Sequence, residues 1–376
     1  MPHSRQPSAA AGRRALLGLI AATAAGPVLA QSPTGSAGST AAPPAAGGAA
    51  PAAPAAPAGP APAAAAITLR WPIYVLNSVD ATVSVIDPVT WAERTRIPTG
   101  KEPHHLYLTP DEKSLLVANA VSNSLTFIDP RTAQVQRTLD NIVDPYHLRF
   151  SPDMKWFVTA ANRLDHVDIY RWQPANTAQP LALAKRIPAA KTPSHIAIDS
   201  KSSVVYVSLQ DSDELIAIDL PTQAVRWKAK VGRMPADVYL APNDKHLFIG
   251  LTGDKLVEVW DVSGANGPVL VKRIETGAGA HAFRALGDGR HVFVSNRVAN
   301  SISQIDIHTM TVVAQLPGPS GPDCMEVSGD GRLLLVSSRW AGRMTVVDIA
   351  SRSVVRQVRV GRGPHGVWTL DHAARQ

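Results

Sequence analysis

The stretch PYHLRFSPDMKWFVTA, residues 145–160, decides the fold of this chain of 376 residues. It contains two short apolar runs joined by the turn sequence Ser151-Pro152-Asp153. Pro and Asp favour the tight turns that connect neighbouring strands. We therefore interpret the stretch as the strands His147–Ser151 and Trp156–Ala160, which further strands follow at His166–Tyr170 and near Ala182–Ile187.

This four-strand unit is one of seven similar copies. Successive copies are separated by 42, 48, 42, 44, 43 and 42 residues and start around His105, His147, His195, Asp237, His281, Cys324 and Gly366. A period of this length, with several short β runs per repeat, indicates a β-propeller with one blade per repeat. We expect an all-β fold, a seven-bladed β-propeller of four-stranded antiparallel blades over residues 67–376.

The two ends of the propeller sequence complement each other. The last inner strand, His365–Leu370, has no strands after it, and the first strands lack an inner partner; these are Ile73–Asn77, Thr82–Asp87 and Glu93–Ile97. Pairing the N-terminal strands with the C-terminal strand closes the ring and removes exposed sheet edges. Six strands also end in Asp, and this repetition indicates turn residues rather than catalytic ones: Asp87, Asp129, Asp219, Asp261, Asp306 and Asp348.

The first 66 residues differ in composition from the rest. Residues 1–30 combine early arginines with the apolar run Ala15–Ala25 and small residues before Gln31, which is typical of a secretory signal peptide. Arg13-Arg14 is compatible with a twin-arginine signal. Residues 31–66 are rich in Ala, Pro and Gly, and we expect a disordered linker. The mature protein is then periplasmic or secreted and has no transmembrane span.

Charge and motif content narrow the classes of function. The formal charge is +7, or +4 without the three arginines of the signal peptide, and no Lys/Arg run accompanies it. Nucleic-acid binding is therefore not expected. Cys324 is the one cysteine, so no internal disulfide forms. Haem-attachment, phosphate-loop, dinucleotide and serine-nucleophile motifs are absent from the sequence. We expect a monomer.

Several strands resemble a known repeat. Tyr74-Val75-Leu76-Asn77, Tyr206-Val207-Ser208-Leu209, Phe293-Val294-Ser295-Asn296 and Val83–Asp87 are similar to the YVTN-type β-propeller repeat. The resemblance covers the chain after the linker and implies an exported propeller. Families with this repeat include YncE-like, cytochrome d1-like and lactonase-like propellers, so the resemblance specifies the fold and leaves the function open.

The inner strands predict a polar ring on the propeller axis. The residue three after the opening Pro, or its equivalent, is apolar in every copy, so its neighbours should face the channel. One set of neighbours forms a candidate copper or zinc site: His105, His147, His195, His281, Asp237 and Cys324. The other set includes the candidate ligand-binding residues Tyr107, Arg149, Tyr239 and Trp368, together with Ala197, Phe283 and Glu326. His104 and His365 stand one residue before positions of the first layer and are further candidate ligand-binding residues.

Three interpretations of this ring remain open: a metal site, a site for an organic or anionic ligand, and polar residues with a structural role. Loops near the ring add a basic rim suited to an anionic ligand or an acidic partner protein: Arg163, Arg297, Arg339, Trp340 and Arg343. We predict a periplasmic binding or scaffold protein that binds a metal, a small ligand or a protein partner at the channel mouth. The alternative is a copper- or zinc-dependent or lactonase-like enzyme that uses the same ring.

Overall fold

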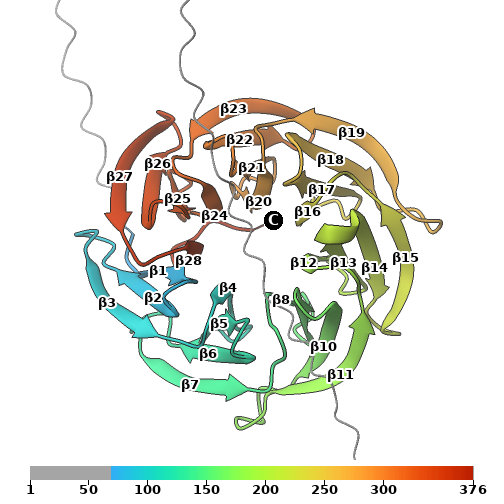
Figure 1. Cartoon of the computed structure of the whole chain (residues 1–376), viewed down its shortest axis with the longest axis horizontal. Helices are drawn as coiled ribbons and strands as arrows, with labels where there is room; N and C mark the ends of the chain where they lie inside the picture. The colour runs from blue at the N-terminus through green and yellow to red at the C-terminus, as the bar shows by residue number, and fades with distance from the viewer. Residues whose placement is uncertain (1–68, 376) are drawn as a thin grey trace, which may run out of the picture. The chain divides into compact units, whose positions relative to one another are not determined.

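Seven four-stranded antiparallel sheets are arranged in a ring in the computed structural model, which describes residues 69–375 (Figure 1). We number the blades I to VII along the chain. From the inner to the outer strand, blade I comprises β4 (Pro103–Leu108), β5 (Leu115–Asn119), β6 (Ser124–Ile128) and β7 (Val135–Asp140). Blade II comprises β8 (His147–Phe150), β9 (Trp156–Ala161), β10 (His166–Trp172) and β11 (Leu181–Pro188). The expected strands of the opening stretch are thus confirmed.

The next four blades repeat this order. Blade III comprises β12 (Pro193–Ile198), β13 (Val204–Leu209), β14 (Glu214–Asp219) and β15 (Ala224–Lys230), with a short 3-10 helix, η1 (Gln210–Ser212). Blade IV comprises β16 (Pro235–Leu240), β17 (His246–Leu251), β18 (Leu256–Asp261) and β19 (Val269–Glu275). Blade V comprises β20 (Ala280–Ala285), β21 (His291–Asn296), β22 (Ser301–Asp306) and β23 (Thr311–Pro317). Blade VI comprises β24 (Pro322–Val327), β25 (Leu333–Ser338), β26 (Arg343–Asp348) and β27 (Ser353–Arg359).

Blade VII joins the two ends of the described chain. Its inner strand is β28 (Pro364–Thr369), and its other strands are β1 (Ile73–Asn77), β2 (Thr82–Ile86) and β3 (Glu93–Pro98). In the β1–β28 register, Tyr74 lies opposite Trp368 and Val75 opposite Val367. This pairing confirms the predicted closure of the ring, because β28 covers the edge of β1 that faces the axis.

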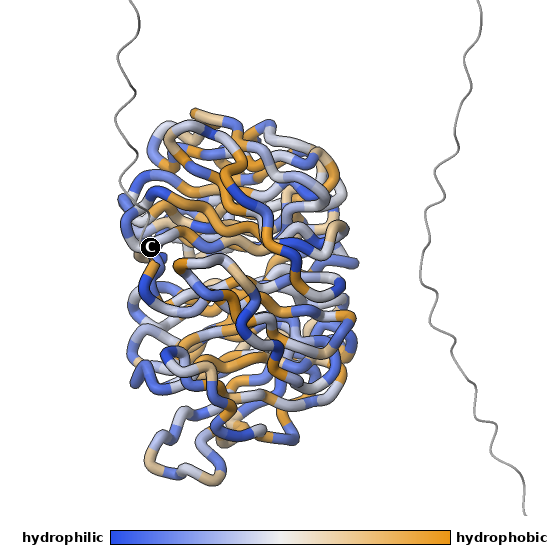
Figure 2. The backbone as a smooth tube through the Cα atoms, turned by 90° about the vertical axis from the view of Figure 1, so that its left-hand side faces the viewer, coloured by the Kyte–Doolittle hydropathy of each residue, from blue (hydrophilic) through white to orange (hydrophobic). Residues whose placement is uncertain are grey.

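The hydrophobic core lies between the blades. One buried cluster, for example, joins Val158 and Ile169 of blade II to Ile196, Val207 and Ile216 of blade III. The outer strands are the most exposed: β7 and β27 each bury one residue, and β15 buries none. In the side view, hydrophobic stretches run through the body of the ring, and hydrophilic residues occupy many of the turns (Figure 2).

The repeated Asp residues at the strand ends are turn residues. Asp129 accepts hydrogen bonds from the backbone N–H groups of Arg131 and Thr132 at 2.8 and 3.0 Å. The other five accept equivalent bonds from residues two or three positions later: Asp87, Asp219, Asp261, Asp306 and Asp348. The structural interpretation of the six carboxylates is therefore confirmed.

Candidate functional site

The site begins with an irregularity in the inner strands. In blade I, Pro103 pairs with Asn119 and Leu106 with Val117, so His104 and His105 together oppose one residue of β5. Such a bulge interrupts the alternation of side chains along a strand. The rings of both histidines contact the ring of His365, with centroids 3.7 and 4.7 Å apart. Two consecutive residues, rather than every second one, therefore reach the axis.

Comparable irregularities occur in the registers of blades III to VII, so three layers of equivalent residues can be defined. Layer A, the first residue after the opening position, contains His104, Tyr146, Ser194, Ala236, His281, Asp323 and His365. Layer B, the next residue, contains His105, His147, His195, Asp237, Ala282, Cys324 and Gly366. Layer C, two residues further, contains Tyr107, Arg149, Ala197, Tyr239, Arg284, Glu326 and Trp368.

The register of blade V corrects the sequence alignment by one residue. Ala280 pairs with Asn296 and Phe283 with Val294. Ala280 and Phe283 therefore take the places that Pro103 and Leu106 take in blade I. His281 therefore belongs to layer A and not to the ring of His105. Phe283 takes the packing position between blades, and Arg284 replaces it in layer C. The slip arose because Ala280 stands where the other blades have Pro.

Layer B brings three histidines from consecutive blades into one group. Ring centroids lie 4.5 Å apart for His105 and His147, 4.8 Å for His147 and His195, and 4.9 Å for His105 and His195. One nitrogen from each ring lies within 4.8 Å of the others. His105 Nε2, His147 Nδ1 and His195 Nε2 are buried and have no hydrogen-bond partner among the described residues. We call this group the histidine trio.

Layer A forms a second polar cluster on the adjoining level. His104 stacks on His365, whose Nδ1 lies 2.8 Å from the carbonyl oxygen of His104. His281 Nδ1 and His365 Nε2 lie 3.0 and 3.6 Å from Asp323 Oδ1. Two further groups of three possible metal ligands result: His104, His105 and His365; and His281, Asp323 and His365.

Burial keeps the axial histidines neutral. It lowers the pKa of His105, His147 and His195 well below the usual range, and neighbouring imidazoles and Arg149 add to this effect. Burial likewise lowers the pKa of the layer A histidines His104, His281 and His365. A neutral imidazole offers one lone pair, which is the form that binds a metal ion.

Asp237 and Cys324 line the axis but belong to no group of three metal ligands among residues 69–375. Asp237 already accepts hydrogen bonds from the N–H groups of Val238 and Phe283, both at 2.8 Å. Burial raises the pKa of Asp237 to about 6 and that of the Cys324 thiol well above its usual value. Of the six predicted metal ligands, the structure thus gathers His105, His147 and His195, whereas His281 lies in layer A.

The predicted basic rim is engaged by carboxylates. Arg163 donates to Asp144 at 2.9 and 3.0 Å. Arg297 and Arg339 both donate to Asp323, at 2.7 and 3.2 Å. Burial acts to raise the pKa of Asp323, but Arg297 and the nearby histidines outweigh it and hold the pKa well below normal. These three arginines are therefore already paired with carboxylates of the protein, while Trp340 and Arg343 are exposed.

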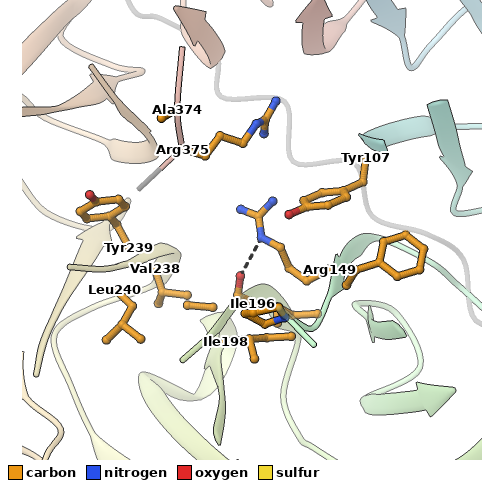
Figure 3. A pocket seen from close by; sticks show the side chains of 12 residues that line it. Tyr107, Arg149, Ile196, Ile198, Val238, Tyr239, Leu240, Ala374 and Arg375 are labelled. Carbon is orange, nitrogen blue, oxygen red and sulfur yellow. Dashed lines mark hydrogen bonds between the residues drawn. The ribbon is translucent and has the colours of Figure 1, made fainter. Parts of the chain in front are cut away.

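A funnel leads toward the trio from the side of layer C. It is a cavity of about 450 Å³ bordered by Tyr107, Arg149, Tyr239 and Arg375, with apolar walls that include Ile198 and Leu240. Arg149 and Arg375 also line a smaller cavity of about 60 Å³, which reaches His105, His147 and His195. Figure 3 shows the guanidinium of Arg149 in the funnel, between Tyr107 and Ile196. Three predicted ligand-binding residues, Tyr107, Arg149 and Tyr239, therefore share one cavity.

Trp368 is placed differently from the other predicted ligand-binding residues. Only 1% of it is exposed, and its ring centroid lies 6.0 Å from that of Tyr74 across the closing strands. Sequence reasoning also missed Asp323 and the pairs that Glu326 forms with Arg284 and Arg375. Asp323 had a signal, because it follows Pro322 as His104 follows Pro103. The contacts of Arg375 depend on the course of the C-terminal segment and had no such signal.

These features define a seven-bladed β-propeller with a buried cluster of histidines on its axis. The chain belongs to the YncE-like β-propeller family, whose family model matches residues 39–375. No curated protein matches the sequence. No helix within residues 69–375 has the length and apolar character that a membrane crossing requires.

Solved structures share the fold at low identity. The periplasmic gluconolactonase PpgL of Pseudomonas aeruginosa is 15% identical with a TM-score of 0.68, over 81% of this chain and 99% of that chain. A Desulfotomaculum acetoxidans protein described as functionally unknown is 14% identical with the same TM-score of 0.68 and the same coverage of 81% and 99%. The dihydro-heme d1 dehydrogenase NirN, in complex with DHE, is 16% identical with a TM-score of 0.60, over 79% of this chain and 74% of that chain. At these identities the similarity establishes the fold alone.

Proposed function

We propose that this protein is an exported, periplasmic binding protein that holds a copper or zinc ion at the histidine trio. The observation that carries the proposal is the convergence of three buried imidazoles: one nitrogen from each lies within 4.8 Å of the others, and each ring has a buried nitrogen without a hydrogen-bond partner in the described chain. An unsatisfied buried polar atom costs about 1–3 kcal/mol, so native proteins rarely leave several together. A shared metal ion would satisfy all three.

The surroundings of the trio support a metal with nitrogen ligands. The three imidazoles are neutral because burial lowers their pKa, so a metal ion would displace no protons from them. Ser194 Oγ lies 2.9 Å from His195 Nδ1, and this contact fixes the ring and leaves Nε2, which has no hydrogen-bond partner in the described chain, as its free nitrogen. An all-imidazole donor set suits both zinc and copper.

Metal analysis of the purified protein tests this proposal. We expect one transition-metal ion per chain at the trio, and loss of that ion in the double variant His105→Ala/His195→Ala. His246→Ala/His308→Ala is the matched control, since both residues lie away from the three metal-ligand groups of the described chain. Circular dichroism would establish that each variant is folded. A folded wild-type protein that takes up neither zinc nor copper after stripping and titration would refute the proposal.

A second candidate is a metal-dependent enzyme, including a lactonase-like one. The favouring observation is that the trio borders a cavity that continues into the funnel. Three protein ligands and one open position are typical of a catalytic zinc site. Hydrolysis of a simple sugar lactone by the metal-loaded wild type, and its loss in His105→Ala/His195→Ala but not in the control, would support this candidate.

A further inference from the structure

We propose that the funnel binds a small amphipathic carboxylate, with the carboxylate at Arg149 and the apolar part against Ile198, Val238 and Leu240. This site lies on the layer C side of the axis, away from the rim of Arg297 and Arg339. It goes beyond the proposed metal site and does not depend on it, because the residues that would hold the anion belong to the protein itself.

The first argument is an imbalance of charge. Three guanidinium groups gather at the narrow end of the funnel: Arg149, Arg284 and Arg375. Arg284 and Arg375 both pair with the buried carboxylate of Glu326. Arg149 has no carboxylate partner within residues 69–375; its Nε donates to the carbonyl oxygen of Ile196 at 3.3 Å. Arg149 is half-buried, and a partly desolvated guanidinium without a carboxylate partner favours the binding of an anion.

The second argument is that the two carboxylates lining or bordering the small cavity, Asp237 and Glu326, already accept hydrogen bonds from other groups and form no ion pair with Arg149. Asp237 also lines the small cavity, but backbone N–H groups hold both of its oxygens. Glu326 is fully buried and shared by two arginines. A planar carboxylate fits the two terminal nitrogens of Arg149 and could form parallel hydrogen bonds with them.

The third argument concerns the shape and lining of the cavity. A volume of about 450 Å³ is within the range of small-molecule sites. One wall is apolar, with Ile198, Val238 and Leu240, while Tyr107 and Tyr239 border the cavity beside the arginines (Figure 3). Arg149 also lies over the ring of Tyr107, 5.2 Å from its centroid, and this contact positions the guanidinium. The cavity therefore combines a cationic end with an apolar wall.

Isothermal titration of metal-free protein tests the site, with octanoate as the probe and octanamide as its neutral counterpart. We expect octanoate to bind once per chain and octanamide about tenfold or more weakly, because a hydrogen bond to a charged group contributes more than one to a neutral group. Arg149→Gln should weaken octanoate binding about 10- to 100-fold, and Arg149→Lys should weaken it less. Arg226→Gln makes the same change on the exposed strand β15 and should leave binding unchanged.

A second variant fills the cavity and keeps the positive charge of Arg149. Ala197 occupies in layer C the position that Tyr107 and Tyr239 occupy in their blades, so Ala197→Tyr would fill the funnel with a side chain already used there. We expect it to abolish octanoate binding while the thermal unfolding curve shows a folded protein. Equal affinity for octanoate and octanamide, or equal octanoate affinity of wild type and Arg149→Gln, would overturn the proposal, as would a failure of the wild type to bind octanoate.

Discussion

At the scale of single residues, Asp323 organises layer A of the axis. It is fully buried, and two guanidinium groups and two imidazoles surround its carboxylate. Sequence reasoning assigned Arg297 and Arg339 to an external ligand, whereas Asp323 engages both. Breaking a buried charge cluster of this kind by removing one partner typically costs about 3–5 kcal/mol. The arrangement places the His281 and His365 rings beside the Asp323 carboxylate, although His281 Nδ1 and His365 Nε2 have no hydrogen-bond partner in the described chain.

The neutral axial histidines predict a pH dependence of stability. Their pKa values are lowered in the folded state, so below the unfolded value of about 6.5 the unfolded chain binds more protons. The free energy of unfolding should therefore fall as the pH decreases from 7 toward 5, by about 1.4 kcal/mol per pH unit for each histidine that stays neutral. Urea unfolding of metal-free protein at several pH values measures this change.

The variant His105→Gln/His195→Gln provides the comparison for this pH dependence. It removes two of the titrating imidazoles and keeps polar side chains in their place, so its free energy of unfolding should change less steeply with pH. Equal slopes for wild type and variant between pH 5 and 7 would contradict the assignment of neutral, buried imidazoles to these positions.

At the scale of elements, the closing strand β28 shows what a buried aromatic residue contributes to the ring. Trp368 is 1% exposed and packs in a cluster with Tyr74, Leu76 and Leu106, whereas Trp340 is 59% exposed in a loop. Trp368→Ala should lower the free energy of unfolding by about 3–5 kcal/mol, because it leaves a cavity between blades VII and I. Trp340→Ala should change it by about 0.5 kcal/mol or less.

Denaturant unfolding of both tryptophan variants measures this difference, and octanoate titration of Trp368→Ala separates the structural role from the predicted ligand-binding role. A Trp368→Ala protein of wild-type stability that no longer binds octanoate would show that Trp368 contacts the ligand. Because Trp368 is buried away from the funnel, we expect instead a Trp368→Ala protein that is less stable and still binds octanoate.

The inner strands also show why the fold was predictable and the site only partly so. The spacing of the repeats and the Asp turns depend on local sequence, and they predicted the blades and the closure by β28. The bulge beside Pro103 is a feature of pairing between strands, and strict alternation cannot reveal that His104 and His105 both reach the axis. In blade V the same bulge follows Ala280, so the sequence pattern shifted His281 by one residue.

At the scale of the whole molecule, the ring gathers residues that are far apart in sequence around a single axis. His105, His147 and His195 come from three consecutive blades, and His365 comes from the strand that closes the ring. Glycine at position 366 permits this approach, since a Cβ there would lie 2.9 Å from Leu76 Cδ1 and 3.2 Å from the carbonyl oxygen of His104. The axis thus has one level, layer A, that the Asp323 carboxylate organises, and a second level, layers B and C, that the two cavities reach.

A metal ion at the trio would connect blades I, II and III, and this geometry gives a prediction for the entire ring. Adding zinc or copper to metal-free protein should slow amide hydrogen exchange most in β4, β8 and β12 and least in the outer strands of blades V and VI. It should also stabilise the fold by about 2.7 kcal/mol at a metal concentration one hundred times the dissociation constant. Exchange followed by mass spectrometry localises the effect, and His105→Ala/His195→Ala should lose it. Protection centred on blades V and VI would instead place the ion at His281, Asp323 and His365, one of the two other groups of possible ligands on the axis.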